Sequence, residues 1–314
     1  MLFTKELYKM PLYQVGAIIK NQREELGLTQ EELADGICSV PTLSRIESGL
    51  NQPNKNHLEM LLQRLGYSFA SSDVLTDKQQ FMSHEMKNKV REAYVEQDYP
   101  LAMKHLRSFD MLSHSTSHID KQFSMLYHTL LDQSQCTNAE KLKQLETALL
   151  LTCPKYKTAR IPHVLSYEEI ILLNNIAICY EKDGNSDLAI SILTALKDYY
   201  QRHIVSNEET LRTEPMILYN LSKMLGLYGR YDECIAICDL GIHMARATGR
   251  CQVLGQTLFN RAWVLIQRNQ PGDHDAARYG LKQAYYFSEV MQHTKEKETI
   301  SKFYEESFSE KILI

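Results

Sequence analysis

Residues 27–49 read GLTQEELADGICSVPTLSRIESG, two short amphipathic segments separated by a tight turn. Thr29 is placed to cap the first segment, and Glu32, three residues later, completes a capping box. Ser39 is placed to cap the second segment, and Pro41 lies in its first turn, where a missing N–H costs no helical hydrogen bond. The stretch therefore predicts two short helices joined by a turn, which is a helix-turn-helix unit.

The residues on both sides of this stretch also follow a helical period. Before it, apolar residues recur on one helical face and stop at Gly27, which would end a helix; they are Leu12, Val15, Ile19 and Leu26. After it, four leucines form a second stripe that Gly66 closes; they are Leu58, Leu61, Leu62 and Leu65. We therefore expect a small bundle of four or five helices within the first 70 residues.

The composition is that of an ordinary globular protein, with 314 residues, 44% hydrophobic and 24% charged side chains. The net charge is −4, and the first 70 residues carry seven basic and eight acidic side chains, so any binding to nucleic acid depends on local placement of charge. No apolar run has transmembrane length and no signal peptide is evident, so we expect a cytoplasmic protein that does not enter a membrane. Seven cysteines occur without CxxC pairs or a Cys/His cluster, so we expect reduced thiols, no metal and no cofactor.

A helix-turn-helix inserts one helix into the DNA major groove, where the N-terminal side chains of that helix meet base edges. Arg45 is the candidate to bind guanine O6 and N7 in a bidentate manner. The other candidates for contacts with bases are two apolar residues, which could meet thymine methyl groups, and two hydroxyl residues: Val40, Pro41, Thr42 and Ser44. The candidates for phosphate contacts are Gln30, at the start of the second helix, and Lys55 or Asn54, after the third helix. Ser39, which caps the third helix, is also expected at the DNA-binding surface. The alternative is a small helical bundle with a solvated third helix and no DNA partner.

Two sets of charged residues are interpreted as structural and not as parts of a binding site. Arg23 and Glu47 are predicted to form an ion pair that ties the first helix to the third, because burial of either charge alone would be costly. Adjacent acidic residues are interpreted as solvated helix faces, since neighbours in a helix point in diverging directions; these pairs are Glu24–Glu25, Glu31–Glu32 and Glu168–Glu169.

From about residue 85 the pattern changes to consecutive helical pairs. The clearest pairs lie at residues 172–193, 218–242 and 257–287, with degenerate copies at 90–109 and 123–151. The first helix of each clear pair carries a small residue, and a second small residue after the turn lets the two helices approach; these are Ala177 with Ala189, Ser222 with Cys234, and Ala262 with Ala276. The spacing predicts a tetratricopeptide-like α-solenoid of five helical pairs.

Two resemblances follow from these motifs. GLTQEELA, the tight turn, SRIESG and LEMLLQRLG resemble the phage-repressor-like XRE family of DNA-binding domains over residues 12–67. GICSVPTLSRIESG followed by IAICYEKDG, YNLSKMLGLYGRYDECI and LGQTLFNRAWVL resembles the RRNPP group of peptide-responsive quorum-sensing regulators over nearly the whole chain. The resemblance implies a cytoplasmic, homodimeric transcription regulator that binds a palindromic operator and a short signalling peptide. We expect a DNA-binding domain at 1–69, a linker at 70–84 and a peptide-binding and dimerisation domain at 85–314.

Asparagine recurs just before the small residues of three successive repeats. A carboxamide both donates and accepts hydrogen bonds, as an extended peptide backbone requires. By resemblance to the RRNPP group, the residues that would hold the peptide backbone are Asn174, Asn220 and Asn260, with Asn175 as the alternative in the first repeat. Tyr219 and Phe259 could line side-chain pockets. The alternative is that these asparagines bridge neighbouring helices and that the aromatic residues are core.

No catalytic motif occurs: phosphate-binding glycine loops, GxSxG and HExxH are absent, so we expect no enzyme. Two other functions remain open at this stage. One is a protein-interaction adaptor that grips a partner protein with its repeats. The other is a repressor without a peptide ligand that uses its repeats only to dimerise.

Overall fold

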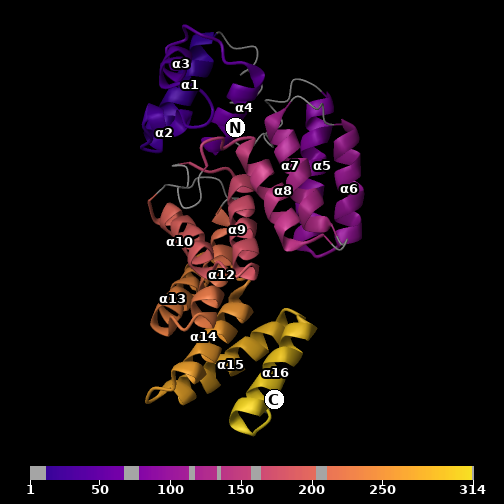
Figure 1. Cartoon of the computed structure of the whole chain (residues 1–314), viewed down its shortest axis with the longest axis vertical. Helices are drawn as coiled ribbons and strands as arrows, with labels where there is room; N and C mark the ends of the chain where they lie inside the picture. Colours follow the sequence, from indigo (N-terminus) through magenta and orange to yellow (C-terminus); the bar gives the residue numbers. More distant parts are fainter. Residues whose placement is uncertain are drawn as a thin grey trace. The chain divides into compact units, whose positions relative to one another are not determined.

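The computed structural model describes residues 12–66, 78–112, 117–132, 136–156, 164–202 and 211–312, and within these ranges every regular element is a helix (Figure 1). The all-helical class is therefore confirmed. The helices are α1 (Leu12–Glu25), α2 (Gln30–Ala34), α3 (Val40–Glu47), α4 (Lys55–Arg64), α5 (Lys78–Val95), α6 (Tyr99–Leu112), α7 (His118–Leu131), α8 (Asn138–Leu150), α9 (Tyr167–Lys182), α10 (Ser186–Arg202), α12 (Glu214–Leu227), α13 (Tyr231–Thr248), α14 (Leu254–Arg268), α15 (Asp273–Val290) and α16 (Thr294–Phe308).

The chain forms two compact units. The first holds Met1–Gly184 with Gln201–Thr210, and the second holds Asn185–Tyr200 with Leu211–Ile314. The first unit contains both the helix-turn-helix bundle and the first repeat helices. Residues 70–77 of the expected linker lie outside the described residues, and residues 78–84 begin α5.

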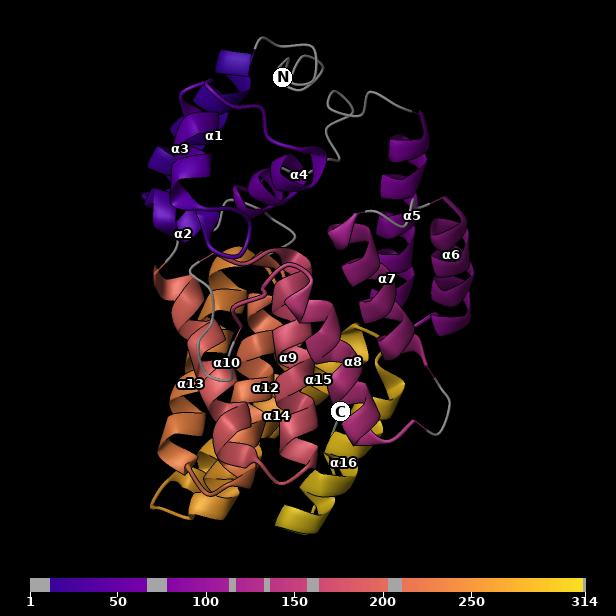
Figure 2. The ribbon, with the colours of Figure 1, turned by 45° about the horizontal axis from the view of Figure 1, so that its top comes forward.

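Helices α1 to α4 form the predicted small bundle around one apolar core (Figures 1 and 2). Ile19, Leu33, Leu43 and Leu61 are fully buried in it. A Cβ atom at Gly16 would lie 2.0 Å from the backbone oxygen of Ile46, so the absence of a side chain allows α1 and α3 to pack this closely. The capping box of Thr29 and Glu32 is present, as the sequence predicts.

Four helices of the first unit, α5 to α8, form two successive antiparallel pairs, and α9 packs against α7 and α8. An aromatic cluster lies between α6 and α7, where the Phe109 and Phe123 rings are 5.0 Å apart. In the second unit, α12 packs on α13 and α14 on α15, and α16 follows as a single helix. The helical repeats expected after residue 85 are therefore confirmed.

One small-residue assignment is wrong. Ala277, not Ala276, is fully buried in α15, and Ala276 is exposed. Gly280 completes the close approach to α14, because a Cβ atom there would lie 3.5 Å from that of Ala262. The seven cysteines are all free thiols. In the described part of the chain, no helix is long and apolar enough to span a membrane.

Candidate nucleic-acid interface and peptide site

The N-terminus of α3 is held in place by its cap. The Ser39 side chain accepts a hydrogen bond from the Thr42 backbone N–H at 3.3 Å, and its Oγ lies 2.7 Å from the Thr42 hydroxyl. Leu43 and Ile46 point into the core, so the opposite face of α3 is exposed. The predicted base-contacting residues share that face: Val40, Pro41, Ser44 and Arg45.

The Arg45 side chain is available for a ligand. It is exposed, and within the described residues no hydrogen bond or ion pair engages its guanidinium. The first turn of α3 contains no acidic residue, so the partial positive charge of the helix N-terminus is not neutralised from within the helix. Thr42 differs from its neighbours, because its hydroxyl already bonds to Ser39 and mainly fixes the cap.

The predicted ion pair between Arg23 and Glu47 is present. The two side chains are buried, with Arg23 Nε 2.6 Å from Glu47 Oε1 and Arg23 Nη2 3.1 Å from Glu47 Oε2. Arg23 also donates to the Leu28 backbone oxygen at 2.7 Å. The hydrogen bond with Glu47 raises the pKa of Arg23 above its ordinary value, although burial opposes this. The pair joins α1, the following turn and α3.

The predicted phosphate contacts fall into different environments. Gln30 Nε2 donates to Glu47 Oε2 at 2.7 Å, so this amide binds within the protein. Asn54 is exposed and caps α4 by accepting from the His57 backbone N–H at 2.8 Å. Lys55 begins α4, and its side chain lies outside the described residues. Leu50, which no sequence argument selected, is 80% exposed in the turn after α3. The helical period of Leu43 and Ile46 would place position 50 on the inward face, so this period did not indicate the exposure of Leu50.

The structure distinguishes the two asparagines of α9. Asn174 is only 2% exposed, whereas Asn175 is half-buried and donates to the Ile171 backbone oxygen at 2.8 Å. Asn175 also lies two residues before Ala177. The structure therefore favours Asn175, the alternative, over Asn174 as a group that a peptide could reach.

In the second unit, Asn220 and Asn260 are half-buried and also lie two residues before their small residues. Asn260 Nδ2 donates to Ser222 Oγ at 3.2 Å, and Ser222 donates in turn to the Tyr219 backbone oxygen at 2.8 Å. Asn260 therefore bridges α14 to α12 in this structure, which is the structural role left open by the sequence.

The two aromatic candidates are half-buried. Phe259 packs edge-on against Phe303 of α16, with ring centroids 5.3 Å apart. Burial, and to a smaller extent the nearby Glu296 carboxylate, raise the pKa of Tyr219 above its ordinary value. Phe259 thus has a packing role within the second unit, while Tyr219 keeps a protonated hydroxyl.

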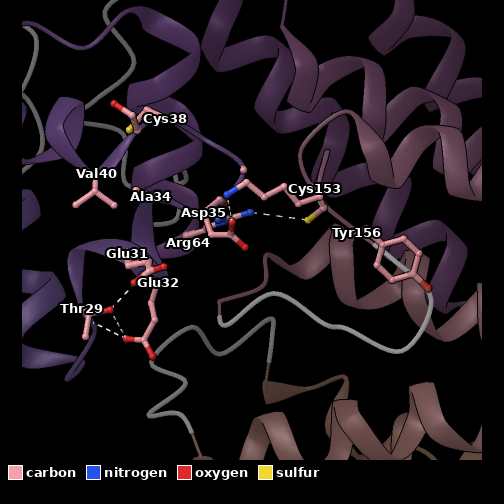
Figure 3. Close-up of a pocket in the computed structure, with 13 residues that line it drawn as sticks. Thr29, Glu31, Glu32, Ala34, Asp35, Cys38, Val40, Arg64, Cys153 and Tyr156 are labelled. Atoms are coloured by element: carbon pink, nitrogen blue, oxygen red, sulfur yellow. Dashed lines mark hydrogen bonds and ion pairs between the residues drawn. The ribbon is translucent and has the colours of Figure 1, made fainter.

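A cavity of about 460 Å³ lies beside the helix-turn-helix, within the first unit (Figure 3). One wall consists of α2 and the turn after it, including Glu31, Asp35 and Cys38. Arg64 and Cys153 lie on another side, with the Arg64 guanidinium directed at the Cys153 sulfur 3.8 Å away. The polar wall groups at this end of the cavity bond to one another, so they form a connection between elements rather than an empty set of ligand groups.

The interpretation of Glu168 and Glu169 as a solvated face is wrong. Both are buried, with 1% and 2% exposure, at the N-terminus of α9. Glu169 completes a capping box with Ser166, and Glu168 forms an ion pair with Arg91. Adjacent glutamates do diverge, as expected, but each meets a basic or polar partner from another helix. A serine three residues before a glutamate was the signal for the cap, and no local signal indicated the burial.

Comparison with known proteins gives two sequence matches. The model of a helix-turn-helix family matches residues 19–71, and the model of the RNPP family C-terminal domain matches residues 134–302. No curated protein sequence matches the chain.

Solved structures share the fold. Bacillus thuringiensis PlcR in complex with the peptide PapR7 and DNA is 20% identical, with a TM-score of 0.59 over 92% of this chain and 99% of that chain. The apo form of the competence regulator ComR from Streptococcus vestibularis is 16% identical, with a TM-score of 0.57 over 95% of this chain and 99% of that one. The model of the C-terminal domain matches more than half of this chain, so the chain belongs to the RNPP family.

Proposed function

We propose that this protein is a sequence-specific, DNA-binding transcription regulator controlled by a short peptide bound in its repeat domain. The observation that carries the DNA-binding part is the exposed N-terminal face of α3, with its unengaged Arg45 and no acidic residue in its first turn. The similar PlcR structure contains DNA and the peptide PapR7. The protein would act in the cytoplasm without catalysing a reaction, with residues 1–69 binding DNA, 70–84 linking and 85–314 binding the peptide.

The candidates on the DNA side divide by role, and Ser39 with Thr42 fixes the start of α3. Arg45 reads guanine, and the remainder of the exposed α3 face, Val40, Pro41 and Ser44, contacts neighbouring base edges. Asn54 and Lys55, at the start of α4, contact phosphate and fix the register. Gln30 reaches a phosphate only if its hydrogen bond to Glu47 is exchanged.

The regulator acts as a homodimer on a palindromic operator, because two identical helix-turn-helix domains related by a twofold axis read two inverted half-sites. Peptide binding changes DNA affinity only if the peptide prefers the conformation that fits both half-sites. A peptide with equal affinity for both conformations would have no effect.

The DNA-binding role is tested by Arg45→Ala, after selection of the operator from a random DNA library. Loss of a bidentate contact to guanine lowers operator affinity by about 10- to 100-fold, whereas binding to random DNA changes little. Arg107→Ala is the matched control, because Arg107 is also exposed, on α6, and carries the same charge. Equal affinity of Arg45→Ala and the wild type for the operator, measured at one salt concentration, would exclude base reading by Arg45.

On the peptide side, the proposed backbone-binding amides are Asn175, Asn220 and Asn260; Asn174 is left out because it is buried. Asn260 binds the peptide only if its hydrogen bond to Ser222 is exchanged. Native mass spectrometry of the protein purified from its own host tests for a bound peptide. With that peptide in hand, Asn220→Ala lowers its affinity about tenfold without changing the melting temperature of the free protein. A lower melting temperature with unchanged peptide affinity would assign Asn220 to structure.

A further inference from the structure

Two adjacent buried carboxylates at the N-terminus of α9 contact groups from several separate elements. Glu169 Oε1 accepts hydrogen bonds from Thr152 at 2.6 Å and from the Cys153 thiol at 3.0 Å, and lies 3.7 Å from Arg64 Nη2 of α4. Burial, together with the Glu169 charge, raises the pKa of the Cys153 thiol well above its ordinary value, which keeps this thiol a donor. Glu169 therefore connects α9 to the helix-turn-helix bundle and to the segment after α8.

Glu168 makes a parallel set of contacts. Its Oε2 accepts from Gln63 Nε2 of α4 at 3.0 Å, and its Oε1 pairs with Arg91 of α5. Arg91 lies over the rings of Phe123 and Tyr167, with its guanidinium carbon 5.6 and 5.1 Å from their centroids. Two consecutive residues at the end of α4 thus contact two consecutive residues of α9: Gln63 binds Glu168, and Arg64 binds Glu169.

Arg64 extends the network to the turn that precedes α3. Its guanidinium donates to the backbone oxygens of Asp35 and Thr152, the latter at 3.4 Å. The Asp35 side chain pairs with Lys155 at 2.8 Å. Both side chains of the Arg64–Glu169 pair are 2% exposed, so separating them would leave a charge without its partner in a poorly solvated site.

We propose that Glu168 and Glu169 are positioning residues that fix the helix-turn-helix bundle in one orientation on the first repeat helices. The functional consequence of this inference rests on the proposed function. If the protein binds DNA as proposed, a fixed orientation makes operator affinity depend on the spacing of the half-sites. A bundle without these contacts to α9 would tolerate several spacings.

The direct test needs neither DNA nor peptide. Spin labels are placed at positions 50 and 111 of the full chain through p-acetylphenylalanine, because Leu50 and Met111 are 80% and 88% exposed and belong to the bundle and to α6. Pulsed EPR should give a narrow distance distribution for the wild type and a broad one for Glu168→Gln/Glu169→Gln. Glu140→Gln is the matched control, since Glu140 completes the same capping box on α8 but is exposed. A broad distribution in the wild type would overturn the proposal.

A second variant covers the case in which the double glutamine variant does not fold. Arg64→Met/Glu169→Gln removes both charges together, and paired replacement of a buried ion pair is often neutral for stability. We expect this variant to melt near the wild-type temperature and still to give a broad distance distribution. A wild-type distribution in this folded variant would show that the pair does not set the orientation.

A DNA-binding experiment tests the functional consequence. It uses palindromic operators in which the spacer between the two half-sites is changed by two base pairs. We expect the wild type to lose about tenfold in affinity and the folded variant to lose much less, because half-site spacing is a geometric requirement of a rigid dimer. Equal spacing selectivity of the two proteins would contradict the proposal. If the wild type binds no DNA, the proposed function fails, and the EPR result alone decides whether Glu168 and Glu169 position the bundle.

Discussion

Two of the helices that begin with a serine cap, α3 and α9, present opposite environments. Ser39 caps α3 and is exposed, and Ser166 caps α9 and is 3% exposed. Each serine accepts the backbone N–H three residues later at 3.3 Å. The residue at that position is Thr42 in α3 and Glu169 in α9.

The difference explains why one helix start is suited to bind an external anion and the other is not. Backbone N–H groups and the helix dipole favour negative charge at both N-termini. In α9 the chain supplies that charge itself, through Glu168 and Glu169. In α3 the first turn is uncharged, so a DNA phosphate or an electronegative base edge can take the place that a carboxylate occupies in α9.

Thr42→Glu would give α3 the capping box of α9 and should produce the largest effect. The new carboxylate stabilises the helix start but repels DNA phosphate, so operator affinity falls by about 100-fold or more. Fluorescence anisotropy with the selected operator measures this loss. Ser191→Glu, which adds the same charge at an exposed site of α10, should leave the affinity unchanged. Unaltered binding by Thr42→Glu would mean that the N-terminus of α3 does not face DNA.

Glu169→Ala tests the α9 side of the comparison. It removes a cap and leaves the buried Arg64 guanidinium without its carboxylate, so we expect the free energy of unfolding to fall by about 3 kcal/mol. Chemical denaturation at neutral pH measures the change. Glu140→Ala, which breaks the equivalent but exposed capping box of α8, should cost much less than Glu169→Ala. Similar losses of unfolding free energy in both variants would show that burial does not increase the contribution of the α9 capping box to stability.

The contrast also separates what sequence predicts from what it cannot. Capping and helical periodicity depend on residues within one or two turns, so local spacing predicts the caps, the helix-turn-helix and the repeats. It also predicts the Arg23–Glu47 pair, because the helix-turn-helix fold that these turns specify brings α1 and α3 together. The burial of Glu168 and Glu169 does not follow, since the Glu168 partners Gln63 and Arg91 are 105 and 77 residues away, and the Glu169 partner Arg64 lies in α4. For the same reason, the choice between Asn174 and Asn175 required knowing which face of α9 is packed.

The surroundings of α9 should also respond to acid, in contrast to the first turn of α3, which contains no titratable side chain. Burial and the nearby Arg91 and Lys87 charges lower the pKa of His84 from 6.5 to about 4, although Glu168 opposes them. Between these values the unfolded chain binds a proton that the folded chain does not, so stability decreases as pH falls from about 6.5 to 4.

We therefore expect the wild type to lose about 1 kcal/mol more than His84→Gln between pH 7 and pH 5, after allowance for partial solvent exposure. Urea unfolding of both proteins at the two pH values measures the difference. An equal loss in both proteins would assign the acid sensitivity to other groups.

The smallest effect is expected at the exposed edge of the same junction. Lys155 pairs with Asp35 at 2.8 Å, but its side chain is 76% exposed, so water and salt already stabilise both charges when they are apart. Lys155→Ala should therefore change the free energy of unfolding by less than about 0.5 kcal/mol, and the spacing selectivity for the operator should remain that of the wild type. Arg64 bonds to the same turn from the buried side, through the Asp35 backbone oxygen. A loss for Lys155→Ala as large as that for Glu169→Ala would place the connection between the bundle and the repeats at the surface and not at the N-terminus of α9.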